Sequence, residues 1–281
     1  MIRNRVEHRT EEPNSVFSNM PFTPAHPAIL LPLKIFRNLK LSWTALIIGS
    51  IVPDFEYFIW LSSCASVSHT ISGILTFNLP LTIILSYLYH RIIYPVLWPR
   101  LNFFKETINF EHREDFFEWL KKNWLMFTVS ALIGILSHLI WDSFCHANGY
   151  MVHQIPFLLE TATVGAYEIR RCYLLWYGST VAGCIAMAII YLNFKKVLSK
   201  ENWKTFFAGG AFWGKILFLA ILIASIRIAI GLSWNWTRHL VIISLGSFFY
   251  ATIIVCWLEM AKREELIRRE AIPTVKNKGK Y

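Results

Sequence analysis

The sequence predicts an all-α fold: a polytopic membrane helical bundle of six to seven transmembrane helices, with its C-terminus in the cytoplasm. Of its 281 residues, 55% are apolar and 16% are charged, whereas soluble domains average about 45–50% apolar and about 25% charged residues. The 28 Lys and Arg residues exceed the 18 Asp and Glu residues by ten, but they stand in short runs between long apolar stretches. This distribution indicates membrane topology, and it argues against a nucleic-acid partner.

One integral domain is expected to occupy most of the chain. The first 19 residues are polar and lack an apolar core of the length found in secretory signals, so residues 1–19 are predicted to be a disordered or mis-annotated extension. Residues 20–261 contain the long apolar stretches without a repeat or a linker, and they are predicted to form the integral membrane domain. Residues 262–281 are basic and are predicted to form a cytoplasmic tail.

The apolar stretches set the number of spans, because a helix needs about 17–25 mainly apolar residues to cross a bilayer. Four stretches are strong candidates at this length: 124–144, 173–194, 216–232 and 239–260. Two more, 41–61 and 70–89, are long enough but are broken, the first at Pro53 and the second at Asn78 and Pro80. Such breaks are tolerated where a helix lines the protein interior. A seventh piece, 27–41, extends only about 21 Å at 1.5 Å per residue, so it is predicted to be a short tilted span or a half-inserted helix.

Charge between the spans gives the orientation. If the piece 27–41 crosses the bilayer, alternate connections carry most of the Lys and Arg residues, together with the basic segment after residue 260. Connections rich in Lys and Arg lie on the cytoplasmic side of membrane proteins. The sequence therefore predicts a cytoplasmic C-terminus and an opposite, less basic face outside the cytoplasm.

Three carboxylates interrupt the apolar stretches near histidines: Asp54, Glu56 and Asp142. A carboxylate at the centre of a membrane helix costs about 2.5–3.5 kcal/mol on insertion scales, so a compensating interaction is expected. His138, Asp142 and His146 are spaced four residues apart, and each step turns about 40° around a helix of 3.6 residues per turn. The three therefore share one stripe. Imidazole and carboxylate at this spacing suit a metal ion, and a seam of hydrogen-bonded neutral histidines between helices explains the trio equally well.

The ends of neighbouring spans supply further candidates. His26 opens the first apolar piece, Asp54 lies toward the end of the second, and His69 opens the third. Antiparallel neighbours bring these ends to the extracytoplasmic face, where the segment 138–146 closes the fourth span. We therefore predict a single site whose metal ligands are His26, Asp54, His69, His138 and His146.

Two carboxylates are predicted to take catalytic roles beside these ligands. Asp142 is expected to be a further ligand, or to orient a histidine that binds the metal. Glu56 is expected to support the site from outside the ligand set or to act as a general base. Asp54 and Glu56 point about 200° apart on a regular helix, so both can serve the site only if Pro53 breaks the helix.

The same residues resemble a known family. The runs 20–27 (MPFTPAHP), 49–57 (GSIVPDFEY), 68–70 (SHT) with Gly73, and 137–144 (SHLIWDSF) with His146 and Gly149 are similar to the bacterial multi-pass membrane family catalogued as domain of unknown function 4184. The resemblance covers about residues 20–194. More distantly, the order of these motifs resembles the inner-membrane metal-dependent hydrolases, which are related to zinc phospholipase C and the P1-type nucleases. That resemblance implies zinc-dependent hydrolysis of phosphodiesters or lipid head groups.

The function predicted from the residues and the resemblance is a membrane-bound, metal-dependent hydrolase of the bacterial cytoplasmic membrane. Zn²⁺ is its expected cofactor, and its expected partners are membrane lipid and a lipid or lipid-linked phosphodiester substrate. Two alternatives remain open. A transporter also uses intramembrane His and Asp, as proton relays, and a non-catalytic scaffold uses such a cluster to fasten its helices. The chain has neither a G-x-x-x-x-G-K-[ST] fingerprint nor a G-x-S-x-G nucleophile elbow.

Overall fold

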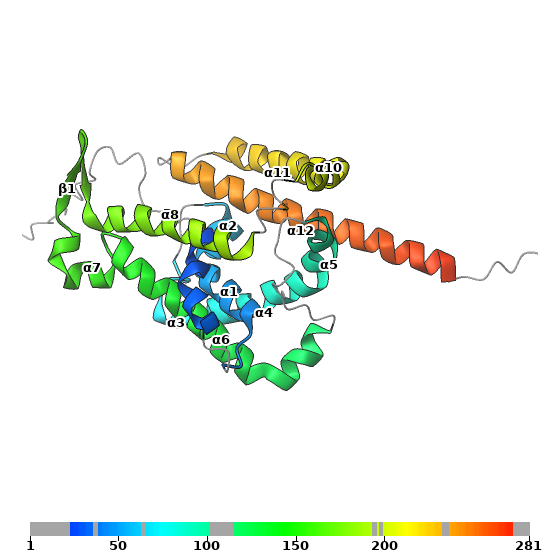
Figure 1. Ribbon diagram of the computed structural model, residues 1–281, viewed down its shortest axis with the longest axis horizontal. Coiled ribbons are helices and arrows are strands. Elements are labelled where there is room, and N and C mark those ends of the chain that lie inside the picture. Colours follow the sequence, from blue (N-terminus) through cyan, green and yellow to red (C-terminus); the bar gives the residue numbers. More distant parts are fainter. Residues whose placement is uncertain are drawn as a thin grey trace, which may run out of the picture.

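The computed structural model describes residues 23–35, 39–62, 66–101, 115–192, 196, 199–231 and 236–271, which form an almost entirely helical bundle (Figure 1). The predicted all-α class is confirmed. Five segments are long and apolar enough to cross a membrane: Ile71–Arg100, Phe116–Cys145, Arg171–Tyr191, Gly210–Ile230 and His239–Arg269. The chain is therefore a multi-pass membrane protein. The predicted extension 1–19 lies outside the described residues.

These five segments correspond to the predicted spans 70–89, 124–144, 173–194, 216–232 and 239–260. The two apolar pieces nearest the N-terminus form shorter elements. Helix α1 (Trp43–Ile51), the 3₁₀ turn η2 (Val52–Asp54) and helix α2 (Phe55–Trp60) follow one another directly. Pro53 lies in η2, where its missing N–H interrupts the helical hydrogen bonds. The structure thus supports five spans. The other two predicted pieces, 27–41 and 41–61, form the shorter elements near the N-terminus.

The first of these pieces is the 3₁₀ helix η1 (Thr23–Ile35), which contains Pro27 and Pro32. Each proline removes one backbone donor, which disfavours a regular α-helix. At about 2.0 Å per residue, its 13 residues extend about 26 Å, less than a hydrocarbon core of about 30 Å. The helix begins four residues before the predicted start at Pro27, so it includes Thr23 and His26.

The predicted break near Asn78 and Pro80 marks a change of helix type. The short helix α3 (Ile71–Gly73) leads into the π-helix η3 (Ile74–Asn78) and then into α4 (Leu79–Leu88), with Pro80 in the first turn of α4. A second π-helix, η4 (Tyr89–Ile93), connects to α5 (Tyr94–Leu97) and the 3₁₀ turn η5 (Trp98–Arg100). Asn78 is buried, and its side chain donates a 2.7 Å hydrogen bond to the Ser68 carbonyl oxygen. The break therefore places a polar group against the turn that precedes α3.

Helix α6 (Phe116–Cys145) is the central element, and α1 packs closely against it. Two glycines permit the close approach. A Cβ atom on Gly134 of α6 would lie 2.4 Å from the Leu46 carbonyl oxygen, and one on Gly49 of α1 would lie 2.6 Å from the Ala131 carbonyl oxygen. Small residues at a helix contact let two membrane helices approach to backbone distance. The carbonyl groups of α1 consequently come within hydrogen-bonding reach of side chains on α6.

The second half of the chain surrounds this centre. Helix α7 (Tyr150–Gln154), the 3₁₀ turn η6 (Pro156–Leu158) and an antiparallel hairpin of β1 (Thr161–Val164) and β2 (Tyr167–Arg170) precede α8 (Arg171–Tyr191). Helix α10 (Lys200–Ala208) leads to α11 (Gly210–Ile230), which runs beside α12 (Trp236–Ala271) in Figure 1. The prediction did not include the hairpin. Helix α12 continues through Ala271, so the described part of the predicted tail 262–281 is helical.

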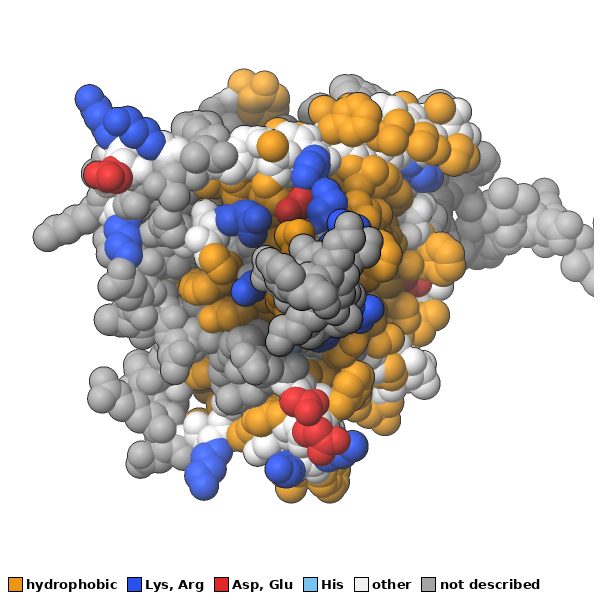
Figure 2. Space-filling view, turned by 90° about the vertical axis from the view of Figure 1, so that its right-hand side faces the viewer, with side chains coloured by type: hydrophobic (Ala, Val, Ile, Leu, Met, Phe, Trp, Pro, Cys, Tyr) orange, Lys and Arg blue, Asp and Glu red, His pale blue; other side chains and the backbone are white. Residues whose placement is uncertain are grey.

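The outer surface has the character expected in lipid. On α11, for example, Phe218 is 71% exposed and Ile221 is 64% exposed. Soluble monomeric proteins rarely expose large contiguous apolar patches of this kind. Lys and Arg side chains gather on the end of the molecule toward which α12 extends (Figure 2). Near that end of α12, Glu264 pairs with Arg91 and Glu259 pairs with Lys215. The bundle thus exposes apolar surface along α11 and carries charged side chains near the C-terminal end of α12.

Candidate metal centre

Four side chains of metal-ligand type meet in the interior of the bundle. Asp54 comes from η2, His69 from the turn before α3, and His138 and Asp142 from one stripe of α6. One ligand atom from each of the four lies within 4.8 Å of the others. The i, i+4 spacing on α6 places His138 and Asp142 together, and the close packing of α1 against α6 brings the adjoining η2 to the same point. These four residues could hold a metal ion.

The distances within this cluster are too long for hydrogen bonds. Asp54 Oδ1 lies 3.6 Å from His138 Nε2 and 3.8 Å from His69 Nε2. Asp142 Oδ2 lies 3.3 Å from His138 Nε2 and 3.7 Å from His69 Nε2, whereas N–H···O bonds measure about 2.7–3.2 Å. Ligand atoms bound tetrahedrally at about 2.0–2.2 Å lie about 3.3–3.6 Å from one another. The spacing therefore fits atoms arranged around an ion better than atoms bonded to each other.

Several buried atoms of these side chains have no hydrogen-bond partner among the described residues. Asp54 Oδ1, His138 Nε2 and Asp142 Oδ1 are buried and make no hydrogen bond within the described part of the chain. The side chains of Asp54 and His138 are 0% exposed, and that of Asp142 is 8% exposed. A buried polar atom without a partner costs about 1–3 kcal/mol, and more if the group is charged. A cation between the two carboxylates and the imidazoles would satisfy Asp54 Oδ1 and His138 Nε2, whereas Asp142 Oδ1 lies toward His26, 3.6 Å from its Nε2 atom.

Contacts from outside the cluster hold the ligand atoms in place. The Nδ1 atom of His138 lies 2.8 Å from the Ser50 carbonyl oxygen, an acceptor only, so Nδ1 carries the proton and Nε2 is left to face the centre. His69 Nδ1 contacts Ser68 Oγ at 2.9 Å. Thr23 Oγ1 donates a 2.6 Å hydrogen bond to Asp54 Oδ2 and leaves Oδ1 free. Histidines and carboxylates that bind metals characteristically have such outer partners.

His26 and His146, both predicted ligands, lie beside this set of four and contact Asp142. His26 Nε2 is 3.6 Å from Asp142 Oδ1, and its ring stacks on the His138 ring with centroids 4.0 Å apart. His146 Nε2 is 3.5 Å from Asp142 Oδ2. The structure thus brings all six predicted cluster residues into one network. Asp142 stands at its centre, because four imidazoles approach its carboxylate.

Glu56 faces away from the centre, toward the turn that carries His69. Its carboxylate accepts hydrogen bonds from the backbone N–H groups of Ser66 at 2.8 Å, Val67 at 3.1 Å and Ser68 at 2.7 Å. The Ser66 hydroxyl adds a further bond of 3.2 Å. Because η2 interrupts the helix at Pro53, Asp54 and Glu56 serve two neighbouring parts of the same site. Glu56 therefore holds the turn from outside the ligand set.

Sequence reasoning gave no role to several residues that support the site. Thr23 and Ser68 lie inside the motif runs that carry the family resemblance. Their closeness in sequence to His26 and His69 could therefore have indicated a role at the site. Ser50 acts through its backbone carbonyl, which no side-chain pattern reveals. Gly73 is needed for space, since a Cβ atom there would lie 1.9 Å from the Val67 carbonyl oxygen and would displace the turn that carries His69.

The fold and the site define a class: a multi-pass helical membrane protein with a buried His/Asp cluster of metal-site geometry. A family model described as Domain of unknown function (DUF4184) matches residues 20–257. The chain belongs to this family, as its motifs led us to expect. Neither the curated proteins nor the solved structures contain a match to the chain.

Proposed function

We propose that the protein is a zinc-type, metal-dependent hydrolase of the bacterial cytoplasmic membrane, acting on a lipid or lipid-linked phosphodiester at the extracytoplasmic interface. The observation that carries the proposal is the convergence of four ligand atoms at separations of 3.3–3.8 Å, with buried atoms left without partners. When bound, a divalent ion such as Zn²⁺ would supply a Lewis acid that lets water act as a nucleophile near neutral pH.

The residues divide into three roles in this proposal. Asp54, His69, His138 and Asp142 hold the ion, and His26 completes the packing behind Asp142. The His69 and His146 side chains are the accessible ones, 31% and 16% exposed, so substrate enters on their side. His146 Nε2 is placed to give a proton to the leaving oxygen or to take one from water.

The position of the cluster along α6 supports the proposed membrane side. Helix α6 is kinked at Asn123, and the 18 residues from Trp124 to Asp142 extend about 27 Å at 1.5 Å per residue, close to the thickness of a hydrocarbon core of about 30 Å. The cluster therefore lies at the opposite end of the span from the basic residues near its start. By the positive-inside rule, that end faces away from the cytoplasm. This position also favours a hydrolase over a transporter, whose substrate site lies near the midplane.

The zinc-loaded protein is expected to hydrolyse a phosphodiester in detergent solution, and His138→Ala is expected to lower the rate by about 100-fold or more, because the substitution removes a ligand. Release of p-nitrophenol from bis(p-nitrophenyl) phosphate, and of head group from phospholipid, measures the rate. Ser143→Ala is the matched control, since the Ser143 hydroxyl donates to the Ile140 carbonyl of its own helix, and within the described residues it makes no other hydrogen bond. Equal rates in the two variants, or no hydrolysis with Zn²⁺, Mn²⁺ or Fe²⁺, would refute the proposed activity.

A further inference from the structure

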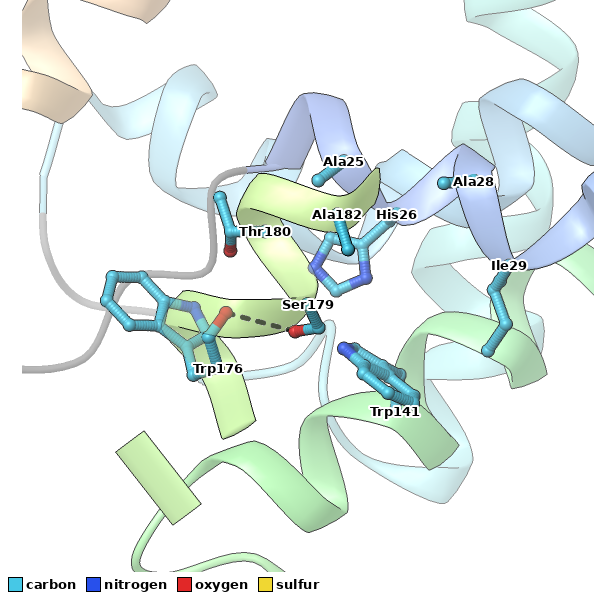
Figure 3. Close-up of a pocket in the computed structure, with 9 residues that line it drawn as sticks. All are labelled: Ala25, His26, Ala28, Ile29, Trp141, Trp176, Ser179, Thr180 and Ala182. Carbon is cyan, nitrogen blue, oxygen red and sulfur yellow. Dashed lines mark hydrogen bonds between the residues drawn. The ribbon is translucent and has the colours of Figure 1, made fainter. Parts of the chain in front are cut away.

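A cavity of about 200 Å³ lies between η1, α6 and α8, next to the cluster (Figure 3). Ala25, Ala28 and Ile29 of η1 form one wall, and Trp141 of α6 and Ala182 of α8 contribute further apolar surface. Alanine side chains leave the space open, since larger residues at these positions would fill it. Among the described residues that line it there is no carboxylate, Lys or Arg, so its surface suits an apolar ligand.

His26 joins this cavity to the cluster. Figure 3 shows its ring, the Ser179 hydroxyl and the Trp141 indole around one space, and the same ring stacks on His138 with centroids 4.0 Å apart. Trp141 directly precedes Asp142 on α6. A ligand in the cavity is therefore separated from the cluster by the thickness of one imidazole ring.

The surroundings identify the chemistry of the ligand. Both α6 and α8 are membrane-spanning, and the neighbouring outward residues of α8 are apolar, with Val181 59% exposed and Ile185 54% exposed. Hydrocarbon chains of lipid are thus the medium next to the cavity. A dry apolar cavity of about 150 Å³ holds a molecule as large as benzene, so this one has room for a short length of hydrocarbon but not for a whole lipid.

We propose that the cavity binds the hydrocarbon segment next to the head group of a membrane lipid, and so places the polar part of that lipid at the His/Asp cluster. This inference rests on the proposed function and names its substrate class: a lipid held by its chain, in preference to a free phosphodiester. Ala25, Ala28 and Ala182 set the width of the chain that fits. Trp141 and Ser179 lie where the apolar wall meets the cluster.

Photolabelling tests this inference. The probe is a phosphatidylethanolamine with a diazirine close to the ester of one acyl chain, added to the full-length protein in mixed micelles. We expect labelling of the cavity residues Trp141, Trp176, Ser179 and Ala182 above the background on Phe218 and Ile221, which face outward on α11. Ala182→Phe fills the cavity and is expected to reduce this labelling to background. Val181→Phe adds similar bulk to the outward face of the same helix and is expected to leave it unchanged.

Size-exclusion chromatography checks folding, and the smaller substitution Ala182→Leu is expected to give intermediate labelling. Two results would overturn the lipid site. One is labelling of the cavity residues no stronger than that of α11, and the other is labelling that neither Ala182→Phe nor Ala182→Leu reduces. Metal content is measured on the same wild-type preparation. A labelled cavity in protein that never binds metal would support the lipid site and would contradict the hydrolase, so the two failures are distinguishable.

Discussion

Replacing Asp142 with asparagine is expected to weaken divalent metal binding by about 100-fold or more, since even residues that only support metal ligands are worth about 10–100-fold in affinity. Asp142 Oδ2 lies within 3.3–3.7 Å of three imidazole nitrogens, and Oδ1 lies 3.6 Å from a fourth. Asparagine keeps the shape of the side chain but removes its charge and replaces one oxygen with an NH₂ donor. Competition with a chromogenic chelator measures the affinity for Zn²⁺.

Ser143→Ala on the next position of α6 is again the control, and it should bind the ion as tightly as the unchanged protein. If Asp142→Asn binds Zn²⁺ with unchanged affinity, the carboxylate at the centre of the network is not a ligand. The four histidines around it would then be a structural seam between helices.

Replacing Glu56 with alanine is expected to lower both the free energy of unfolding and the metal affinity. The substitution leaves the buried N–H of Ser68 without an acceptor, which costs about 1–3 kcal/mol. The N–H groups of Ser66 and Val67 belong to exposed residues, so water can replace the carboxylate there at a smaller cost. Once released, the turn no longer fixes His69, and affinity should fall by about 10–100-fold. Thermal unfolding in detergent and chelator competition measure the two effects.

Glu118→Gln is the matched control, because Glu118 is an exposed glutamate paired with Lys121, and such pairs contribute about 0–1 kcal/mol. A double-mutant cycle separates positioning from general stability. In a His69→Ala background, Glu56→Ala should still lower the unfolding temperature but should not weaken metal binding further. An additive loss of affinity would show that Glu56 acts on the ion by a route other than His69.

The sequence was sufficient for the parts of this protein that depend on composition and helix geometry. Apolar length located five spans, and the period of 3.6 residues placed His138, Asp142 and His146 on one stripe. The direction of the spans then brought His26, Asp54 and His69 to the same end. These inferences succeed because insertion cost and helical spacing are local properties of the chain.

The remaining features depend on contacts between segments that are distant in the sequence. Gly49 and Gly134 are 85 residues apart, and only their packing brings the Ser50 carbonyl to His138. Glu56 accepts hydrogen bonds from backbone N–H groups about ten residues later, and backbone donors leave no trace in the pattern of side chains. The piece 27–41 was predicted as a short helix, but its 3₁₀ type and its start at Thr23 were not. The β-hairpin was missed because its strands, TATV and YEIR, alternate apolar and polar residues over only four positions each, at the lower limit of strand length.

A non-catalytic scaffold makes a different prediction from a metal centre. Buried ionic clusters that only fasten helices can often be replaced by apolar residues of similar volume with neutral or stabilising effect. Asp54 and His138 are 0% exposed and are the residues of the cluster least open to substrate. Removing both therefore tests the cluster as a metal centre and leaves the accessible His69 and His146 unchanged.

The central claim is that this cluster binds a metal ion, and elemental analysis of the detergent-purified protein tests it most directly. The unchanged protein is measured beside the double variant His138→Ala, Asp54→Ala, with folding matched by size exclusion. We expect zinc or another divalent metal in near-stoichiometric amount in the unchanged protein, and its loss in the variant. Metal absent from both proteins after reconstitution, or equal in both, would contradict a metal centre at Asp54, His69, His138 and Asp142.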